Sequence, residues 1–174
     1  MTLRCELNIN GKSRRILLVA KEEETTDHVA LRLAAAILFF DLEPALDVGA
    51  GDPLLADVGF VPDLMAPDGV GGIGVWVECG NVANNKLAKV ARRIKEGRLV
   101  ILKENEAGGR RLREVIKKEV RNGEFIEVLA WPKEEFSRWT AALRESSHVF
   151  GEASGHSLNL VLNESAFDVQ LIAC

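Results

Sequence analysis

The chain has 174 residues, of which 47% are hydrophobic and 28% are charged, and its formal net charge is −4. This apolar content excludes a disordered protein, and the acidic balance excludes a uniformly basic nucleic-acid coat protein. The longest apolar run, residues 33–40, is far shorter than the roughly 20 residues that span a bilayer. Three widely spaced cysteines fit neither a disulfide framework nor a zinc knuckle. We expect a soluble, cytoplasmic protein of one domain, residues 1–174, with no membrane partner.

The first third of the chain predicts a β-hairpin followed by a buried helix. Apolar residues alternate with polar ones over residues 3–20, and Asn10-Gly11 is typical of a two-residue hairpin turn. Thr25 or Thr26 can then cap a helix that extends to about residue 40. So many of its positions are apolar that we expect this helix to be buried on more than one side.

Glycines and prolines dominate the next segment, and two short strands follow it. Residues 41–60 indicate a loop, whereas residues 60–65 and 73–79 are apolar runs separated by a glycine-rich turn at 66–72. This arrangement predicts two adjacent antiparallel strands, of which the second has the composition of an interior strand. The strand at Leu99 is expected to lie beside them.

The rest of the chain alternates between helices and strands. Apolar spacing predicts a helix from residue 81 or 84 to 96, a strand at 98–103, a helix at 108–121, a strand at 125–131, a helix at 132–145, and two late, peripheral strands at 157–162 and 167–172. Short links between strand and helix favour parallel neighbouring strands. We therefore predict the α/β class, with a mixed central β-sheet flanked by α-helices.

The net charge conceals a strong asymmetry along the sequence. Residues 86–121 contain thirteen basic residues and five glutamates, which gives this segment a charge of +8 and leaves −12 for the remainder. Such a basic segment can contact the phosphate backbone of a nucleic acid. The same pattern is also typical of the solvated faces of two crossover helices. Few aromatic residues lie among these charges, so a platform for stacking single-stranded bases is not expected.

Two acidic residues follow apolar runs on the predicted antiparallel pair. Asp63 lies in the first strand, and Glu78 comes directly before Cys79 at the end of the second. Two carboxylates that converge at one place, together with a backbone carbonyl group at Cys79, suit a hard cation such as Mg²⁺ or Mn²⁺. The alternative is an ordinary surface glutamate at the end of a strand. The three histidines, His28, His148 and His156, lack the mutual spacing of a metal site, and we expect surface or capping roles for them.

Three segments together resemble the YaeQ family of small bacterial proteins. They are Val61-Pro-Asp-Leu-Met65, Gly72-Ile-Gly-Val-Trp-Val-Glu-Cys-Gly80 with the helix that follows it, and Glu24-Thr-Thr-Asp-His-Val-Ala-Leu-Arg-Leu33. The resemblance covers roughly residues 1–145, and residues 146–174 match only weakly, as a C-terminal extension. It implies a restriction-endonuclease-like fold and a variant of the PD-(D/E)XK nuclease site.

The resemblance also implies roles for individual residues. Asp63 corresponds to the aspartate of the PD half, Glu78 to the acid of the (D/E)XK half, and Glu24, with Asp27 near it, to an acid from the first helix. Gly80 occupies the position at which the motif has its lysine. On this reading Asp63, Glu78 and the Cys79 carbonyl bind the metal.

A lysine from the next helix can supply the missing ammonium group. Lys86 lies in the first turns of that helix, and Lys89 is one turn further along. Two functions follow, and the sequence leaves both open: a metal-dependent nuclease or phosphodiesterase that uses Lys86, or a catalytically inactive module with the same fold that binds nucleic acid or a protein partner. A third class, a structural protein whose acidic residues form only a surface pocket, conflicts with the joint presence of Glu24, Asp63 and Glu78.

Overall fold

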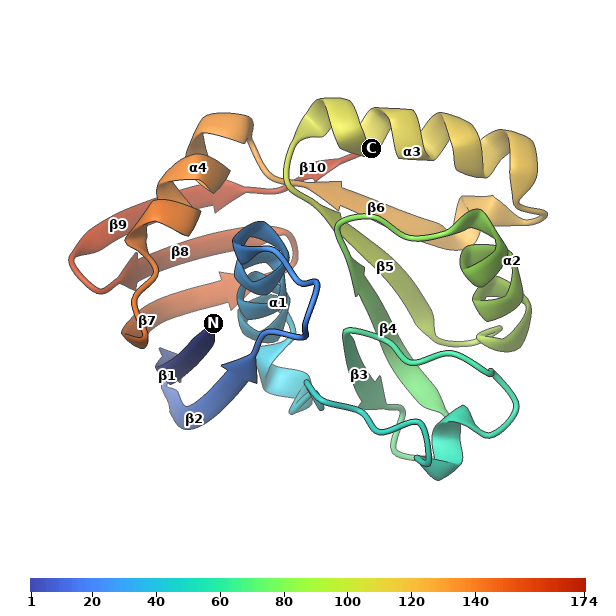
Figure 1. Ribbon diagram of the computed structural model, residues 1–174, viewed down its shortest axis with the longest axis horizontal. Helices are drawn as coiled ribbons and strands as arrows, with labels where there is room; N and C mark the ends of the chain where they lie inside the picture. Colours follow the sequence, from blue (N-terminus) through green and yellow to red (C-terminus); the bar gives the residue numbers. More distant parts are fainter.

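The computed structural model describes residues 1–174 and contains two five-stranded mixed sheets and four α-helices (Figure 1). The first sheet has the spatial order β2-β1-β7-β8-β9, with β1 at Thr2–Ile9, β2 at Lys12–Val19, β7 at Ser146–Ser154, β8 at Ser157–Leu162 and β9 at Ser165–Gln170. The second has the order β10-β6-β5-β4-β3, with β3 at Leu64–Pro67, β4 at Ile73–Cys79, β5 at Arg98–Lys103, β6 at Ile126–Ala130 and β10 at Ile172–Ala173. The helices are α1 at Thr26–Leu38, α2 at Asn84–Arg93, α3 at Glu106–Glu119 and α4 at Lys133–Ala142.

Helix α1 lies between the two sheets, and it explains why there are two. Its residues Val29–Ile37 are all buried, and the helix contacts β2 and β7 of the first sheet and β3, β4 and β5 of the second (Figure 1). A helix that is apolar on every side must be covered from every side. The predicted α/β class is therefore confirmed, but the strands form two sheets where we expected a single central one.

The second sheet has the predicted strand arrangement. Strand β3 is antiparallel to β4, with Leu64 opposite Val77, and β4, β5 and β6 are parallel neighbours. Alternate residues of β5 pack on opposite faces: Val100 belongs to the core that contains α1, and Ile101 to a second core formed with α2 and α3. The antiparallel pair and its neighbour at Leu99 are thus confirmed, although the first strand begins at Leu64 and leaves Asp63 just outside it. Both crossover helices cover one face of this sheet.

The first sheet contains a strand that the sequence pattern did not reveal. Strand β7 is parallel to β1 in the middle of the sheet, with Cys5 opposite Ser147. Its inward positions carry the small residues Ser147 and Ala153 beside Val149, so the apolar alternation is weak. The two late strands were predicted correctly, although β8 is an interior strand of the sheet. The chain then returns to the second sheet, where β10 pairs with β6.

Helix α4 joins the two halves of the core through aromatic packing. Trp139 contacts Trp131 and Phe167, with ring centroids 5.4 and 5.3 Å apart, and its indole N–H donates to the carbonyl of Ala30 in α1 at 3.1 Å. Buried aromatic rings contribute a large apolar area, and the hydrogen bond satisfies the buried indole donor. None of the four helices has the length and apolarity required to cross a membrane.

Candidate functional site

Asp63 lies just before β3 and is fixed to the end of β4. Its backbone N–H donates to the carbonyl of Val77 at 3.1 Å, and its Oδ2 accepts a hydrogen bond from the backbone N–H of Cys79 at 2.8 Å. Its Oδ1 lies 3.0 Å from Nε2 of His28. Burial raises the pKa of this carboxyl, but the hydrogen bond and charge of His28 and the Cys79 amide outweigh burial and lower it overall. Asp63 is therefore held as a carboxylate.

Glu78 is buried in β4 with a donor on each of its oxygens. Because side chains alternate along a strand, Trp76 shares its face, and the indole N–H donates to Oε1 at 2.7 Å. The ammonium of Lys86 lies 2.8 Å from Oε2 and 2.7 Å from Oε1. Burial raises the pKa of Glu78, although the Lys86 charge opposes that rise. The carboxylate is thus engaged on both sides within the protein.

Lys86 reaches the site from the first turn of α2, and Lys89 does not. The Lys86 ammonium also donates to the carbonyl of Val61 at 2.9 Å, which ties the helix to the segment that precedes Asp63. Lys89 instead lies over the ring of Phe60, with its ammonium 5.6 Å from the ring centroid. Of the two lysines considered from the sequence, only Lys86 contacts a predicted site residue, and its catalytic role stays a prediction.

Gly80, the position that the resemblance aligns with a lysine, follows β4 in a conformation that suits glycine. Its φ of +69° is in the left-handed region, which glycine adopts without strain, and its N–H donates to the carbonyl of Leu102 at 2.9 Å. A lysine at this position would be strained in this conformation. The backbone conformation therefore favours glycine at this position.

Glu24 precedes α1 and is paired mainly with a buried arginine. Both of its oxygens lie 3.1 Å from Nη1 of Arg32, whose side chain is only 1% exposed, and Oε2 also accepts from the N–H of Lys21 at 2.8 Å. Arg32 extends the network to Asp47 at 2.9 Å. The side chain of Asp27 is exposed and forms no hydrogen bond or ion pair. Both acids line the cavity described below, but only Glu24 joins the hydrogen-bond network, and its functional role stays a prediction.

His28 joins two of the predicted acids, and the expectation of a surface or capping role for its side chain was wrong. Nε2 lies 3.0 Å from Asp63 Oδ1 and 3.2 Å from Glu24 Oε1. Only its backbone N–H serves the cap, donating to Oγ1 of Thr25 at 3.2 Å. His28 and Arg32 are four residues apart and share a face of α1, and Glu24 just before the helix contacts both; that spacing is the sequence signal that was missed.

An open acidic cavity of about 340 Å³ adjoins this network. It is lined by Glu23, Glu24, Thr25, Asp27, His28, Leu31, Gly80, Asn81 and Glu104. Asp63, Glu78 and Lys86 do not line it. The predicted site residues therefore form two groups: Glu24 and Asp63 are joined by His28, which lines the cavity, and Glu78 is paired with Lys86 away from it.

The donor set does not fit a divalent metal as the side chains stand. Both oxygens of Asp63 and of Glu78 already have protein donors, and no group of three or more His, Cys, Asp or Glu side chains is arranged to hold a metal ion. Cys79 contributes its N–H to Asp63, whereas the predicted ligand was its carbonyl oxygen. Burial raises the pKa of the Cys79 thiol far above its ordinary value, so the thiol is inert.

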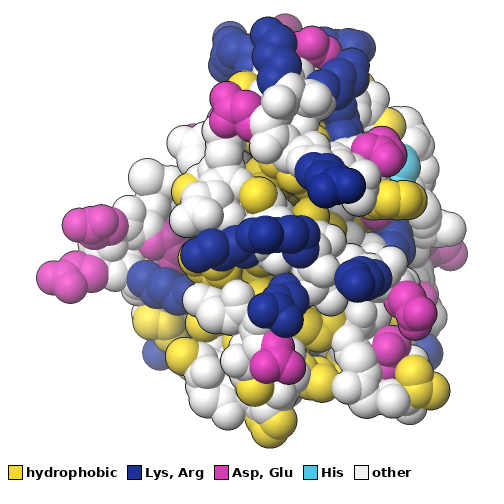
Figure 2. Space-filling view, turned by 90° about the vertical axis from the view of Figure 1, so that its right-hand side faces the viewer, with side chains coloured by type: hydrophobic (Ala, Val, Ile, Leu, Met, Phe, Trp, Pro, Cys, Tyr) yellow, Lys and Arg dark blue, Asp and Glu magenta, His cyan; other side chains and the backbone are white.

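The basic segment 86–121 divides into internal and free cations. Six of its thirteen basic residues pair with glutamates or donate to backbone carbonyls outside their own helix: Lys86, Arg98, Lys103, Arg110, Arg113 and Lys117. The other seven are exposed and have no ion-pair partner within 4 Å: Lys89, Arg92, Arg93, Lys95, Arg111, Lys118 and Arg121. Of these, Arg92 donates only to the carbonyl of Ala88, one turn back in α2, at 3.3 Å. Figure 2 shows Lys and Arg side chains gathered across one face of the molecule. The charge asymmetry of the sequence is therefore present at the surface.

Four of these free cations line one hollow, which we call the α2 groove. Lys89, Arg92, Arg93 and Lys95 surround a space of about 730 Å³ together with Asp57 and Val58. Arg93 and Lys95 also line an adjoining hollow of about 540 Å³. The groove is therefore a cationic surface with a single acid in its lining.

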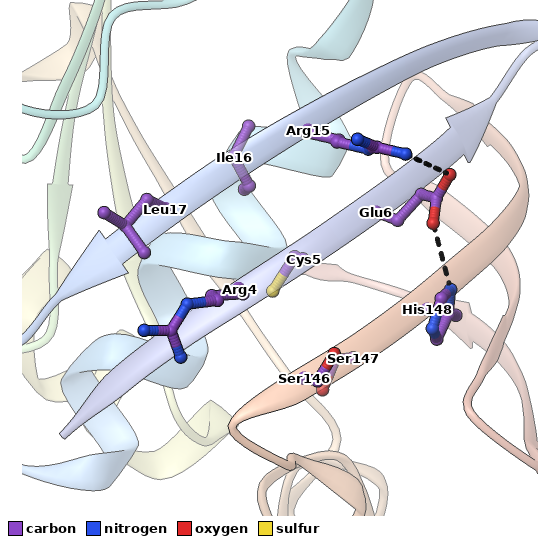
Figure 3. A pocket seen from close by; sticks show the side chains of 9 residues that line it. All are labelled: Arg4, Cys5, Glu6, Arg15, Ile16, Leu17, Ser146, Ser147 and His148. Carbon is purple, nitrogen blue, oxygen red and sulfur yellow. Dashed lines mark ion pairs between the residues drawn. The ribbon is translucent and has the colours of Figure 1, made fainter.

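Another cavity, of about 380 Å³, lies on the first sheet and is unrelated to the predicted site (Figure 3). Glu6 of β1 is paired there with Arg15 of β2 at 3.8 Å and with His148 of β7 at 3.4 Å. His148 is two-thirds exposed, as expected for a surface histidine. This cavity contains none of the predicted site residues.

Comparison with known proteins identifies the fold. No protein-family model matches the sequence, and no curated protein matches it. In the solved structures, the YaeQ protein from Xanthomonas axonopodis pv. citri is similar, with a TM-score of 0.76 and 16% identity over 99% of this chain and 96% of that chain. The YaeQ protein from Pseudomonas syringae has a TM-score of 0.73 and 18% identity over 99% of this chain and 94% of that chain. The likeness includes residues 146–174, whose sequence resembles the family only weakly. The chain has a YaeQ-like fold over nearly its whole length.

Proposed function

We propose that the protein binds nucleic acid through the α2 groove and that it does so without metal-dependent hydrolysis. The observation that carries the proposal is the free charge of the groove: Lys89, Arg92, Arg93 and Lys95 are exposed, unpaired and gathered around one hollow. A nucleic-acid backbone presents a regular row of phosphates, and each cation that neutralises a phosphate releases a bound counterion.

The groove favours contacts with the backbone over contacts with stacked bases. Its lining contains no aromatic residue. The ring of Phe60 lies under the Lys89 ammonium, 5.6 Å from its centroid, but does not line the groove. Many proteins that bind single strands gain affinity by stacking bases on aromatic side chains, which this groove lacks. Its cations can contact only phosphates, and phosphate contacts carry no sequence information, so we expect binding that depends little on sequence.

The acidic site supports the non-catalytic alternative over the nuclease. Catalysis at a PD-(D/E)XK site needs carboxylates free for a metal, whereas the oxygens of Asp63 and Glu78 are held by His28, the Cys79 amide, Trp76 and Lys86. One observation favours the nuclease: Lys86 lies 2.8 Å from Glu78, so the lysine and the acid of the motif are together. The experiment below therefore includes an arm that detects hydrolysis.

Neutralising the groove is expected to weaken nucleic-acid binding by about tenfold or more at low salt. The variant is Arg92→Gln/Arg93→Gln/Lys95→Gln, which removes three cations without changing buried residues. Binding is measured by fluorescence anisotropy with short labelled duplex DNA, duplex RNA and single strands in EDTA. The matched control, Arg4→Gln/Lys12→Gln/Arg15→Gln, removes the same charge from the first sheet and should bind as the wild type does.

Equal binding by the wild type and the groove variant would contradict the proposal, and so would no binding by the wild type. The hydrolysis arm repeats the incubation with Mn²⁺ and follows strand length on a denaturing gel. We expect all strands to stay intact. Cleavage by the wild type that disappears in Glu78→Ala would establish the nuclease instead.

A further inference from the structure

His28 occupies an unusual place between two acids. Its Nε2 is 3.2 Å from Glu24 Oε1 and 3.0 Å from Asp63 Oδ1, so a single nitrogen atom contacts one oxygen of each carboxylate. The resemblance to the YaeQ family implies a metal held by Asp63, Glu78 and the Cys79 carbonyl, whereas in this chain one oxygen of Asp63 contacts His28, which Glu24 contacts as well. The disagreement concerns the position of one atom, and it can be tested.

We infer that the His28 imidazole takes the place of a divalent cation between Glu24 and Asp63, and that removing it opens a latent Mg²⁺ or Mn²⁺ site. The two oxygen atoms already converge on one point, because both lie within 3.2 Å of the same nitrogen. Two carboxylates completed by water molecules are a common way for proteins to bind Mg²⁺. The inference does not depend on the proposed nucleic-acid binding.

The rest of the network holds both carboxylates in position without His28. Arg32 contacts both oxygens of Glu24 at 3.1 Å, and the Cys79 N–H donates to the other oxygen of Asp63 at 2.8 Å. Ligand oxygens that are fixed by neighbouring donors lose less conformational entropy when a metal binds. Removing the imidazole should therefore leave two oriented carboxylate oxygens.

Water and ions can reach this point from solvent. Glu24 and His28 both line the open cavity of about 340 Å³, and the Gly80 backbone forms another part of its wall. Nδ1 of His28 lies toward Gly80, where an added Cβ would be 3.6 Å away. The space left by the ring is thus continuous with the cavity, which can supply the water ligands that Mg²⁺ retains.

Glu78 does not provide an equivalent latent site. Its two oxygens are held by Trp76 and Lys86 on the other side of β4. Removing Lys86 would leave one buried carboxylate with the Trp76 indole as its remaining donor and no second carboxylate that contacts the same group. The inference is therefore specific to the pair Glu24 and Asp63.

The test is calorimetric titration of Mn²⁺ into the wild type and His28→Ala, with His148→Ala as the matched control. His148 contacts one acid, Glu6, at 3.4 Å on the exposed sheet. We expect His28→Ala to bind one Mn²⁺ on the order of tenfold or more tightly than the wild type or His148→Ala. Adding Asp63→Asn to His28→Ala should abolish the gain.

Equal Mn²⁺ affinity in the wild type and His28→Ala would overturn the inference, whether both bind or neither binds. Weaker binding by His28→Ala would overturn it as well, because the imidazole would then be a ligand. Circular dichroism and thermal melts establish that each variant is folded, and His28→Ser provides a second variant with a smaller change in polarity. A rise in melting temperature with Mn²⁺ in His28→Ala, absent from the wild type, is the independent readout.

Discussion

Replacement of Lys86 by methionine is expected to lower the free energy of unfolding by about 3 kcal/mol at neutral pH. Glu78 is 5% exposed, and its ion pair with Lys86 at 2.7 Å supplies the only cation that contacts it. Without the ammonium, a buried carboxylate keeps the indole N–H of Trp76 as its one donor. Urea denaturation of the wild type and the variant measures the difference.

The loss should shrink as the pH falls. Burial raises the pKa of Glu78 in the folded protein above its unfolded value of about 4.3, so the folded state holds this proton more tightly than the unfolded chain does. The stabilisation from that proton is complete below the unfolded pKa and is lost as the pH rises through the folded pKa. Removing Lys86 raises the folded pKa further, so Lys86→Met should approach the wild type at about pH 4.

Two controls separate the ion pair from simple loss of packing. Lys86→Met/Glu78→Gln should recover most of the stability at neutral pH, because no charge is then buried. Lys117→Met removes a lysine from an exposed pair with Glu114 and should leave the melting curve unchanged. A loss in Lys86→Met that is the same at neutral and acidic pH would mean that Glu78 does not carry the effect.

Replacement of Arg32 by methionine is expected to lower the free energy of unfolding by about 3–5 kcal/mol. The guanidinium is 1% exposed, contacts both oxygens of Glu24 at 3.1 Å, and donates to the carbonyl of Val19 at 3.2 Å. Its removal leaves a nearly buried carboxylate without its main partner and a backbone acceptor without its donor. Thermal and urea denaturation provide the measurement.

A double variant tests whether Glu24 is the reason. Arg32→Met/Glu24→Gln should be more stable than Arg32→Met, because the amide removes the uncompensated charge. Arg138→Met, which breaks an exposed pair with Glu135, is the matched control and should change stability little. If both double and single variants are equally unstable, the packing of the arginine side chain determines the loss.

Local patterns predicted most elements of the fold, and the long-range arrangement escaped them. The Asn10-Gly11 turn and the three parallel strands β4, β5 and β6 follow from turn chemistry and short connections. Strand β7 was missed because its inward side carries Ser147 and Ala153 in place of large apolar residues. Its pairing with β1 joins segments about 140 residues apart, and no local signal encodes such a contact.

The contacts of the candidate site were predicted in the same uneven way. The contact between Lys86 and Glu78 could be predicted because the start of a helix lies near the strand end that it follows, whereas the metal-binding role of Asp63, Glu78 and Cys79 stays a prediction. The contacts of His28 and Arg32 were not predicted because their partners depend on how α1 packs: His28 contacts Asp63 just before β3, and Arg32 contacts Val19 and Asp47. Individual side chains of α1 carry ordinary helical patterns, and only the fold shows that His28 Nε2 contacts both Glu24 and Asp63.

The salt dependence of nucleic-acid binding tests the central claim most directly. If the four cations of the α2 groove each neutralise one phosphate, a plot of log Kobs against log salt concentration for duplex DNA should have a slope of about −3 to −4 in EDTA. Arg92→Gln/Arg93→Gln/Lys95→Gln should reduce that slope to about −1. A steep slope that is identical in both proteins, or affinity that does not depend on salt, would contradict binding through this groove.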